Sequence, residues 1–332
     1  MTELARATRG DRRPESLAAA LLEGSPTALA RGLTWAEAGG ERGEALLALT
    51  YARGGRAHVV GVTGAPGSGK STLTRALARV ARQRGRTVGV LAVDPSSPFT
   101  GGAILGDRIR MNDLSLDPGV FIRSMATRGA LGGLCRAAAD AVDLMDAAGR
   151  DVVFVETVGV GQDEVEIMRV AHTVVVVSVP GLGDDVQALK AGILEVADVH
   201  VVNKADREGA DRTIAELRAM LTLVPTPPGV PVPPVLRASA TREEGIEAIA
   251  DAVEAHGAAL ATSGQLDVRR RRAAEARVLA IAGTLIAAAL GDPGRGDDGT
   301  LIEQVAKRTL VPHAAARALL AKARERERTS HV

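Results

Sequence analysis

Gly64-Ala65-Pro66-Gly67-Ser68-Gly69-Lys70-Ser71 is the stretch that decides the fold of this chain, because it is a complete Gly-x-x-x-x-Gly-Lys-Ser phosphate-binding loop. In such a loop the glycines let backbone N–H groups surround a phosphate chain, the lysine reaches the β- and γ-phosphates, and the serine hydroxyl is placed to bind Mg²⁺. An apolar run at 57–63 precedes the loop, and residues 71–82 after it have helical spacing of leucine and valine. We therefore predict a strand, a nucleotide-binding loop from Gly64 to Thr72, and a helix.

Seven short runs rich in β-branched residues cross the middle of the chain, with helical segments between most of them. The runs are 57–63, 87–93, 119–123, 151–157, 173–179, 198–203 and 235–239. Strands that alternate with helices predict an α/β fold, here a P-loop NTPase with a doubly wound, mostly parallel sheet flanked by helices. Ligand-binding loops are then expected at the carboxyl ends of the strands.

Composition points to a globular protein with an aliphatic core, since 46% of the residues are hydrophobic and only 2% are aromatic. The formal net charge of +1 gives no general electrostatic reason to expect nucleic acid or membrane as a partner. The only cysteine, Cys135, cannot form an internal disulfide, which suits a reducing compartment. Met1–Arg13 lacks the apolar core of a signal peptide, and the apolar stretch Val278–Leu290 is too short to span a bilayer. We expect a soluble, cytoplasmic protein.

Three regions are predicted along the chain: a helical N-terminal extension at 1–56, a P-loop domain at 57–262, and a helical C-terminal extension at 263–332. Thr300 to Glu303 fits a capping box that opens one C-terminal helix, and Pro312 begins another. An apolar stripe runs along the first part of this extension, formed by Val278, Ile281, Ala282, Leu285, Ile286 and Ala289. It is either the contact face of a dimerisation arm or a face that packs on the chain's own core.

The base of the nucleotide is indicated by Asn203-Lys204-Ala205-Asp206, which follows the predicted strand at 198–203. The Asp206 carboxylate can accept two hydrogen bonds from the ring N–H and the exocyclic amine of guanine, whereas adenine offers no second donor there. Ser239-Ala240, at the end of the last predicted strand, is placed like a second base-binding loop. Together with the phosphate loop, these elements predict that the chain binds and hydrolyses GTP.

Acidic residues that follow the other strands are candidates for the Mg²⁺ and switch elements. Glu156 ends an apolar run in a Glu-x-x-Gly pattern with Gly159, where it can hold Mg²⁺ directly or through water. Asp94, at the end of the second predicted strand, is a further candidate, with a turn or helix cap as the alternative. Asp107 lies in a Gly-rich segment and is otherwise a surface carboxylate.

Five motifs resemble the MeaB family of GTPases, also named ArgK-like, over about residues 25–290. They are Val93-Asp94-Pro95-Ser96-Ser97-Pro98, Gly101-Gly102-Ala103-Ile104-Leu105-Gly106-Asp107-Arg108, Ser124-Met125-Ala126-Thr127-Arg128-Gly129, Glu156-Thr157-Val158-Gly159-Val160-Gly161-Gln162 and Pro180-Gly181-Leu182-Gly183-Asp184-Asp185. The resemblance implies a homodimeric GTPase that acts as a chaperone of an adenosylcobalamin-dependent acyl-CoA mutase, typically methylmalonyl-CoA mutase. It implies that GTP hydrolysis is coupled to cobalamin loading and to protection against inactivation.

The same resemblance assigns roles to individual residues. Lys70, Asp107 and Glu156 form the implied catalytic set, and the implied metal site consists of Ser71, Asp94, Asp107 and Glu156. The resemblance assigns recognition of the guanine base to Asp206. The segment Gly181–Lys190, with Gly183, Asp184 and Asp185, resembles an additional switch that responds to the mutase. Arg108 stands where relatives often have lysine.

Other assignments stay open. Gln162 is a candidate for orienting the attacking water, and Arg108, Arg110 and Arg128 are candidate arginine fingers, each with a solvated surface role as the alternative. The basic run Arg269–Arg272 is expected to be a solvated helix face. A nickel-insertion GTPase should show clustered His or Cys ligands, and the six histidines and single cysteine are not clustered. A kinase or transport ATPase conflicts with the guanine motif.

Overall fold

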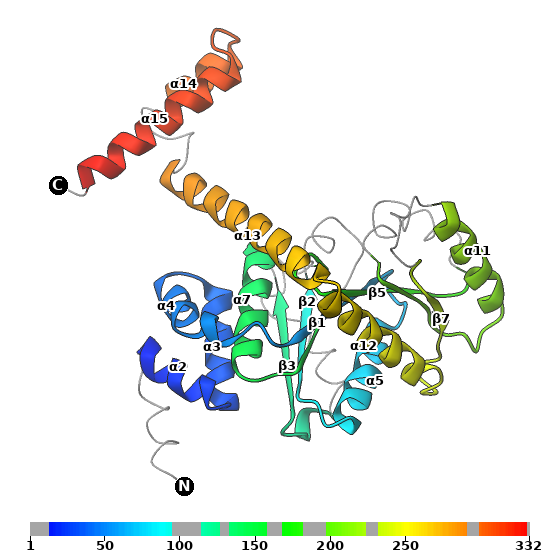
Figure 1. The fold of residues 1–332 in the computed structure, drawn as a ribbon. Coiled ribbons are helices and arrows are strands. Elements are labelled where there is room, and N and C mark those ends of the chain that lie inside the picture. The colour runs from blue at the N-terminus through cyan, green and yellow to red at the C-terminus, as the bar shows by residue number, and fades with distance from the viewer. Residues whose placement is uncertain are drawn as a thin grey trace. The chain divides into compact units, whose positions relative to one another are not determined.

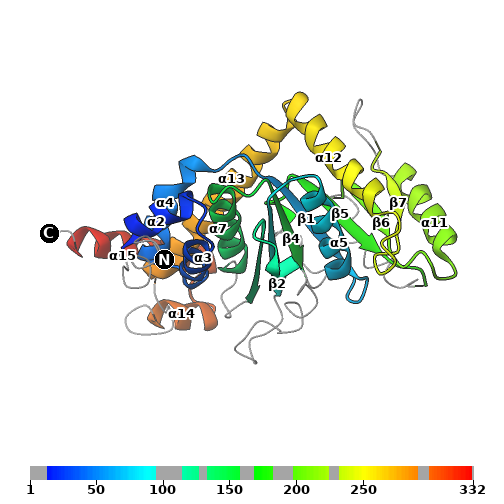
Figure 2. The same ribbon diagram turned by 90° about the horizontal axis from the view of Figure 1, so that it is seen from below.

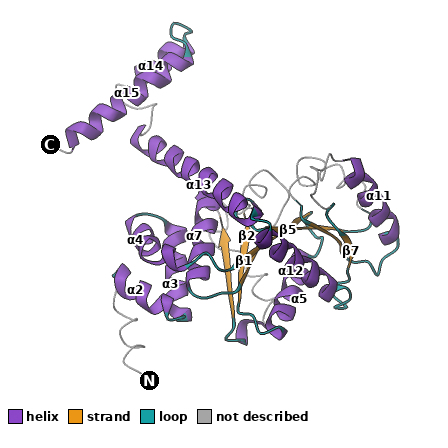
Figure 3. Ribbon diagram, viewed as in Figure 1, coloured by secondary structure: helices purple, strands orange, loops and turns teal. Residues whose placement is uncertain are grey.

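The sheet predicted from the sequence forms the centre of the computed structural model, which describes residues 13–94, 114–126, 133–157, 168–181, 197–223, 232–290 and 299–330. Its strands are β1 (His58–Gly64), β2 (Val88–Asp94), β3 (Val120–Ala126), β4 (Val152–Thr157), β5 (Thr173–Ser178), β6 (Val199–Val202) and β7 (Val235–Arg237). They lie in the order β3-β2-β4-β1-β5-β6-β7, and every neighbouring pair is parallel. Each predicted run overlaps one of these strands, with ends that differ by up to three residues, so the α/β fold is confirmed (Figure 3).

Helices cover both faces of the sheet, which is why its strands are apolar along their whole length rather than alternating. On one face, strand residues such as Val60 and Val175 pack against α5 (Lys70–Gln83) and α12 (Ile246–Thr262). On the other face, strand residues such as Val59 and Val155 pack against α7 (Gly133–Ala147) and the N-terminal helices (Figure 2). The two layers hold the central strands rigidly and leave the carboxyl ends of the strands for ligands.

The N-terminal helices are α2 (Pro14–Leu22), α3 (Pro26–Ala38) and α4 (Glu41–Thr50), followed by the short 3₁₀ helix η1 (Tyr51–Arg53). Ser25 caps α3 by accepting a hydrogen bond from the Ala28 N–H at 3.3 Å, and Pro26 occupies its first turn. Gly39 and Gly40 both have φ values of +70° or more, and they separate α3 from α4. Leu21, Leu29, Leu33 and Leu46 are fully buried, so these helices share one core with the sheet.

The chain divides into two compact units, Met1–Ala273 and Ala274–Val332. The first unit also contains η2 (Leu114–Leu116), α11 (Ala210–Leu223) and the first turns of α13 (Gln265–Leu290) (Figure 1). The second unit contains the rest of α13, α14 (Gly299–Ala306) and α15 (Pro312–Ser330), and α14 contacts α15 within it.

The apolar stripe predicted on α13 is solvent-accessible in the structure, with Val278 64% and Leu285 63% exposed. Among the described residues, α13 is the one helix with the length and composition needed to cross a membrane, since an 18-residue window has a mean hydropathy of 1.7 and two or fewer charged residues. The apolar stretch is therefore longer than the 13 residues noted in the sequence. Length and hydropathy alone do not make a membrane span, because helices of soluble proteins also meet both criteria.

Candidate functional site

The phosphate loop joins the end of β1 to the start of α5, as the sequence predicts. Gly64 has φ +144°, and a Cβ on it would lie 2.1 Å from the carbonyl oxygen of Val177 in β5. Gly69 has φ +88°, and a Cβ there would lie 2.5 Å from the side-chain nitrogen of Asn203. Both positions need glycine, because the loop passes close to β5 and to Asn203 in a backbone conformation that other residues rarely adopt.

Lys70 lies inside this loop rather than in solvent, with 5% of its surface exposed. Its Nζ donates hydrogen bonds to the carbonyl oxygens of Gly64 at 2.7 Å and Ala65 at 2.9 Å. The ammonium group is thus held at the N-terminus of α5, where backbone N–H groups and the helix dipole favour an anion. This arrangement can bind a phosphate group.

Ser71 and Glu156 meet although 85 positions separate them in the chain, and Ser71 Oγ donates to Glu156 Oε1 at 2.5 Å. Glu156 is 5% exposed and lies near the end of β4, where it pairs with Val62 of β1. The next residue, Thr157, donates from its hydroxyl to that of Thr63 at 3.1 Å, a contact that no sequence motif indicated. Two hard oxygen ligands therefore lie together beside the phosphate loop.

Asn203 joins the phosphate loop to the predicted base-binding elements. Its Nδ2 donates to the carbonyl oxygen of Ser68 at 2.8 Å, and its Oδ1 accepts from the Ala240 N–H at 3.0 Å. Lys204, which has a positive φ of 54°, donates from Nζ to the carbonyl oxygen of Gly67 at 2.7 Å. The Asn-Lys pair therefore cross-links three loops at the carboxyl ends of β1, β6 and β7.

Asp206 is held by Ser239, whose hydroxyl donates to Asp206 Oδ1 at 2.8 Å. The guanidinium of Arg242 lies 3.6 Å from the other carboxylate oxygen. The hydrogen bond from Ser239 is the main cause that lowers the pKa of Asp206 below its ordinary value, with Arg242 contributing. The group is therefore an ionised acceptor at neutral pH, the state that guanine recognition requires.

The remaining predicted site residues divide between described and undescribed parts of the chain. Asp94 ends β2, but its side chain is not among those described, whereas Thr72 lies in the first turn of α5. Gly181, after β5, has φ +87°. The other candidates lie outside the described residues: Asp107, Arg108, Arg110, Arg128, Gln162, Gly183, Asp184, Asp185 and Lys190. Within the described part of the chain, no group of three or more His, Cys, Asp or Glu side chains could hold a metal ion.

The expectation that Arg269–Arg272 is a solvated helix face is wrong for its first two members. Arg269 donates two hydrogen bonds to the carboxylate of Asp198, at 2.7 and 2.6 Å, and one to the carbonyl oxygen of His172. Arg270 donates to the carbonyl oxygen of Gly55 at 2.7 Å. The sequence of four consecutive arginines does not indicate which of them pairs with the carboxylate of Asp198, 71 positions earlier.

Known proteins resemble this chain along most of its length. The family described as "Methylmalonyl Co-A mutase-associated GTPase MeaB" matches residues 29–293. A protein of Pyrococcus abyssi that is named as a GTPase is 48% identical over 301 residues, which is 90% of this chain and 93% of the relative. GTPase ArgK of Escherichia coli is 40% identical over 264 residues, 77% of this chain and 80% of the relative.

A solved structure resembles the whole fold. It is described as the crystal structure of a LAO/AO transport system kinase, superposes with a TM-score of 0.71 at 28% sequence identity, and the match covers 96% of this chain and 97% of that one. The family resemblance inferred from the sequence motifs is thereby confirmed.

Proposed function

The chain belongs to the MeaB family of methylmalonyl-CoA mutase-associated GTPases and is a P-loop GTP hydrolase, and from this premise we propose that it serves an adenosylcobalamin-dependent acyl-CoA mutase. It binds methylmalonyl-CoA mutase or a close relative and couples GTP hydrolysis to cofactor loading and to protection of the mutase from inactivation. The family description, which names a mutase association, is the observation that carries this proposal.

In this proposal the nucleotide occupies the loops that Asn203 joins. Gly64 to Thr72 surround the phosphates, Lys70 contacts the β- and γ-phosphates, and the carboxylate of Asp206 accepts from guanine. Ser239 and Ala240 form the second base-binding loop, and the hydroxyl of Ser239 keeps the Asp206 carboxylate oriented. The buried contacts of Asn203 and the lowered pKa of Asp206 support these roles.

Ser71 and Glu156 fit a magnesium ion, because a hydroxyl and a carboxylate are ligands that Mg²⁺ prefers and their oxygens already lie together. We include Asp94 and Asp107 in the same proposal, with Glu156, Lys70 and Asp107 as the catalytic set. When bound, Mg²⁺ supplies positive charge to the β- and γ-phosphate oxygens.

Guanine selectivity is tested with Asp206→Asn, which replaces one acceptor by a donor. GDP binding should weaken by about 1–3 kcal/mol, whereas xanthosine diphosphate should bind more tightly than to the wild type. Calorimetric titrations of wild type and variant with GDP, ADP and xanthosine diphosphate make the comparison. Equal affinity of the wild type for ADP and GDP would contradict the assignment.

Coupling to the mutase is assigned to Gly181–Lys190. Gly181 has a positive φ, and a glycine there leaves the backbone free to rearrange. Asp184→Ala and Lys190→Ala should keep basal GTP turnover within a few-fold and reduce the acceleration by added methylmalonyl-CoA mutase, while Glu208→Ala, an exposed acidic control, changes neither. If basal and stimulated rates fall in parallel, the segment is catalytic or structural instead. If the mutase forms no complex with the wild type, the proposed function itself fails.

Homodimerisation through the C-terminal helices is the last part of the proposal, supported by the exposure of Val278 and Leu285. Deleting 274–332 is the suitable test, because it keeps Arg269 and so leaves the buried carboxylate of Asp198 paired. The shortened chain should be monomeric in light scattering and still bind GDP. A full-length chain that is monomeric at micromolar concentration contradicts this part alone.

A further inference from the structure

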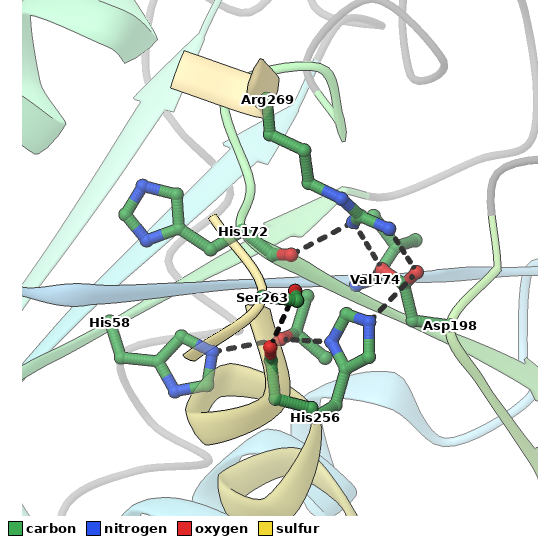
Figure 4. A network of polar contacts seen from close by, with 9 residues as sticks. His58, His172, Val174, Asp198, His256, Ser263 and Arg269 are labelled. Atoms are coloured by element: carbon green, nitrogen blue, oxygen red, sulfur yellow. Dashed lines mark hydrogen bonds and ion pairs between the residues drawn. The ribbon is translucent and has the colours of Figure 1, made fainter. Parts of the chain in front are cut away.

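A network of polar side chains lies at the amino ends of the strands, on the opposite edge of the sheet from the phosphate loop. Figure 4 shows His58, His256, Asp198 and Arg269 converging there. His58 begins β1, Thr173 begins β5 and directly follows His172, and Asp198 directly precedes β6. His256 comes from α12 and Arg269 from the first turns of α13, so the network joins three central strands to two helices.

Asp198 is the centre of the network and is only 10% exposed. Its Oδ2 accepts from the Val174 N–H at 2.9 Å and from Arg269 Nη1 at 2.7 Å, and its Oδ1 accepts from Arg269 Nη2 at 2.6 Å. His256 Nε2 lies 3.3 Å from the same Oδ1. A bidentate arginine–carboxylate pair of this kind fixes the relative orientation of the two side chains as well as their distance. The beginning of α13 is therefore held in one geometry relative to β5 and β6.

The histidines complete the network as neutral rings. Burial lowers the pKa of His58 to about 4 and also lowers that of His256. Because the carboxylate of Asp198 can only accept, a neutral His256 carries its proton on Nε2 and accepts at Nδ1 from the hydroxyl of Thr173, 2.8 Å away. The Thr173 oxygen then accepts from His58 Nε2 at 2.8 Å. The hydrogen bonds are therefore donated in one direction, from His58 of β1 to Thr173 of β5 and from Thr173 to His256 of α12.

Close packing leaves this region little freedom to shift. A Cβ on Gly257 of α12 would lie 2.6 Å from the His58 ring, so the helix contacts the start of β1 directly. The turn between α12 and α13 is closed by Ser263, whose hydroxyl donates to the carbonyl oxygen of Ala259 at 2.7 Å, and by Gly264 at φ +73°. His256 and Arg269 therefore hold the two helices to one carboxylate on either side of a defined turn.

Each strand that begins in this network ends at the candidate nucleotide site. β1 leads to the phosphate loop, β5 passes beside that loop where its Val177 carbonyl approaches Gly64, and β6 leads within five residues from Asp198 to Asn203. The strands are hydrogen-bonded to one another along their length and buried on both faces. A parallel, fully buried strand moves as a unit, because bending it breaks ladder hydrogen bonds and core packing.

We propose that Arg269, Asp198, His256 and Thr173 form a joint that couples the start of α13 to nucleotide binding at the opposite ends of β1, β5 and β6. A nucleotide bound to both the phosphate loop and Asp206 reduces the motion of these strands. Because the joint ties the amino ends of the strands to α13 by hydrogen bonds, the motion of the first turns of α13 is reduced as well. Since α13 continues beyond Ala273, a restraint on its first turns acts on the helix that leads into the second unit. The inference rests on nucleotide binding at this site and not on the identity of the mutase.

Hydrogen exchange of the full-length protein, followed by mass spectrometry of peptides from 265–273, tests the joint. With saturating GDP the exchange of these amides should slow at least about threefold in the wild type. Arg269→Ala should remove most of this nucleotide-dependent slowing, and Arg269→Lys, which keeps the charge but loses the fork of two hydrogen bonds, should weaken it. The lysine variant also serves if the alanine variant does not fold.

Two controls separate coupling from general loss of stability. Arg82→Ala removes a similar pair, in which Nε and Nη2 of Arg82 contact Asp117 at 2.9 and 3.0 Å near the start of β3. Arg272→Ala removes an exposed arginine of the same run. Both should keep the response of 265–273 to GDP. The proposal is overturned if GDP binds the wild type without slowing exchange there, if Arg269→Ala keeps the response, or if Arg82→Ala loses it equally. If GDP does not bind at all, the nucleotide site itself is wrong.

Discussion

Asn203 offers the sharpest test of how the phosphate loop and the base-binding loops are held together. Replacing it by alanine removes two buried hydrogen bonds, to the carbonyl oxygen of Ser68 and from the N–H of Ala240. Asn203 is 2% exposed, Ser68 0% and Ala240 5%, so water cannot readily replace the lost partners. A buried group that loses its partner costs about 1–3 kcal/mol. Asn203→Ala should therefore lower the free energy of unfolding by about 2–6 kcal/mol.

A second substitution separates the two contacts. Asn203→Asp keeps an oxygen that can accept from the Ala240 N–H, but it places an acceptor against the carbonyl oxygen of Ser68. Two facing acceptors repel, and burial of a carboxylate adds a desolvation penalty, so this variant should be at least as unstable as the alanine variant at neutral pH. Asp206→Asn is the matched control. Its side chain lies nearer the surface, so it should weaken GDP binding with little change in stability.

Urea unfolding without nucleotide measures stability, and calorimetric titration with GDP measures binding. If Asn203→Ala unfolds within about 0.5 kcal/mol of the wild type, the two hydrogen bonds do not contribute in solution and the reasoning is refuted. If stability falls but GDP affinity does not, Asn203 holds the fold without positioning the phosphate loop. Loss of both is the expected result, because the phosphate loop would keep the Lys204 contact to Gly67 but lose the buried Asn203 contact to Ser68.

Two further predictions concern the packing and ionisation of the same sheet. Gly64→Ala should destabilise the protein by more than about 3 kcal/mol in urea unfolding, because its Cβ would lie 2.1 Å from the carbonyl oxygen of Val177. The control Gly283→Ala, in open space within α13, should be neutral or slightly stabilising. A soluble, equally stable Gly64→Ala protein would contradict the loop geometry. Burial lowers the pKa of His58 to about 4 and of His172 to about 3 in the folded state. As the pH falls, both histidines are therefore protonated in the unfolded chain before they are protonated in the folded protein. The free energy of unfolding should decrease between about pH 6.5 and pH 4, by up to about 1.4 kcal/mol per pH unit for each histidine. Unfolding curves at pH 7.5, 5.5 and 4.5 check this, and His58→Gln should show a shallower decline.

The sequence was sufficient for the fold because the signals that determine it are local. A buried strand of a parallel sheet needs only to be apolar and β-branched over a few residues; Thr173–Ser178, for example, is buried at every position. The Gly-x-x-x-x-Gly-Lys-Ser pattern likewise requires its own strand and helix on either side. Contacts between distant segments carry no such signal. The sequence assigned Asn203 to base reading, but its two hydrogen bonds to the phosphate loop and to Ala240 appear only when β1, β6 and β7 lie side by side.

Contacts within the described part of the candidate nucleotide site bear on how the protein distinguishes its nucleotides. Asn203 and Lys204 donate hydrogen bonds to the phosphate loop, and Ser239 orients Asp206. In the proposed function these residues contact the base and the phosphates that GDP and GTP share, so they favour both nucleotides alike. A ligand shifts a conformational equilibrium only through contacts that differ between states. In this proposal, sensitivity to the γ-phosphate comes from groups beside it. Among the described side chains these are Lys70, within the phosphate loop, and Glu156, at the end of β4 and in contact with Ser71.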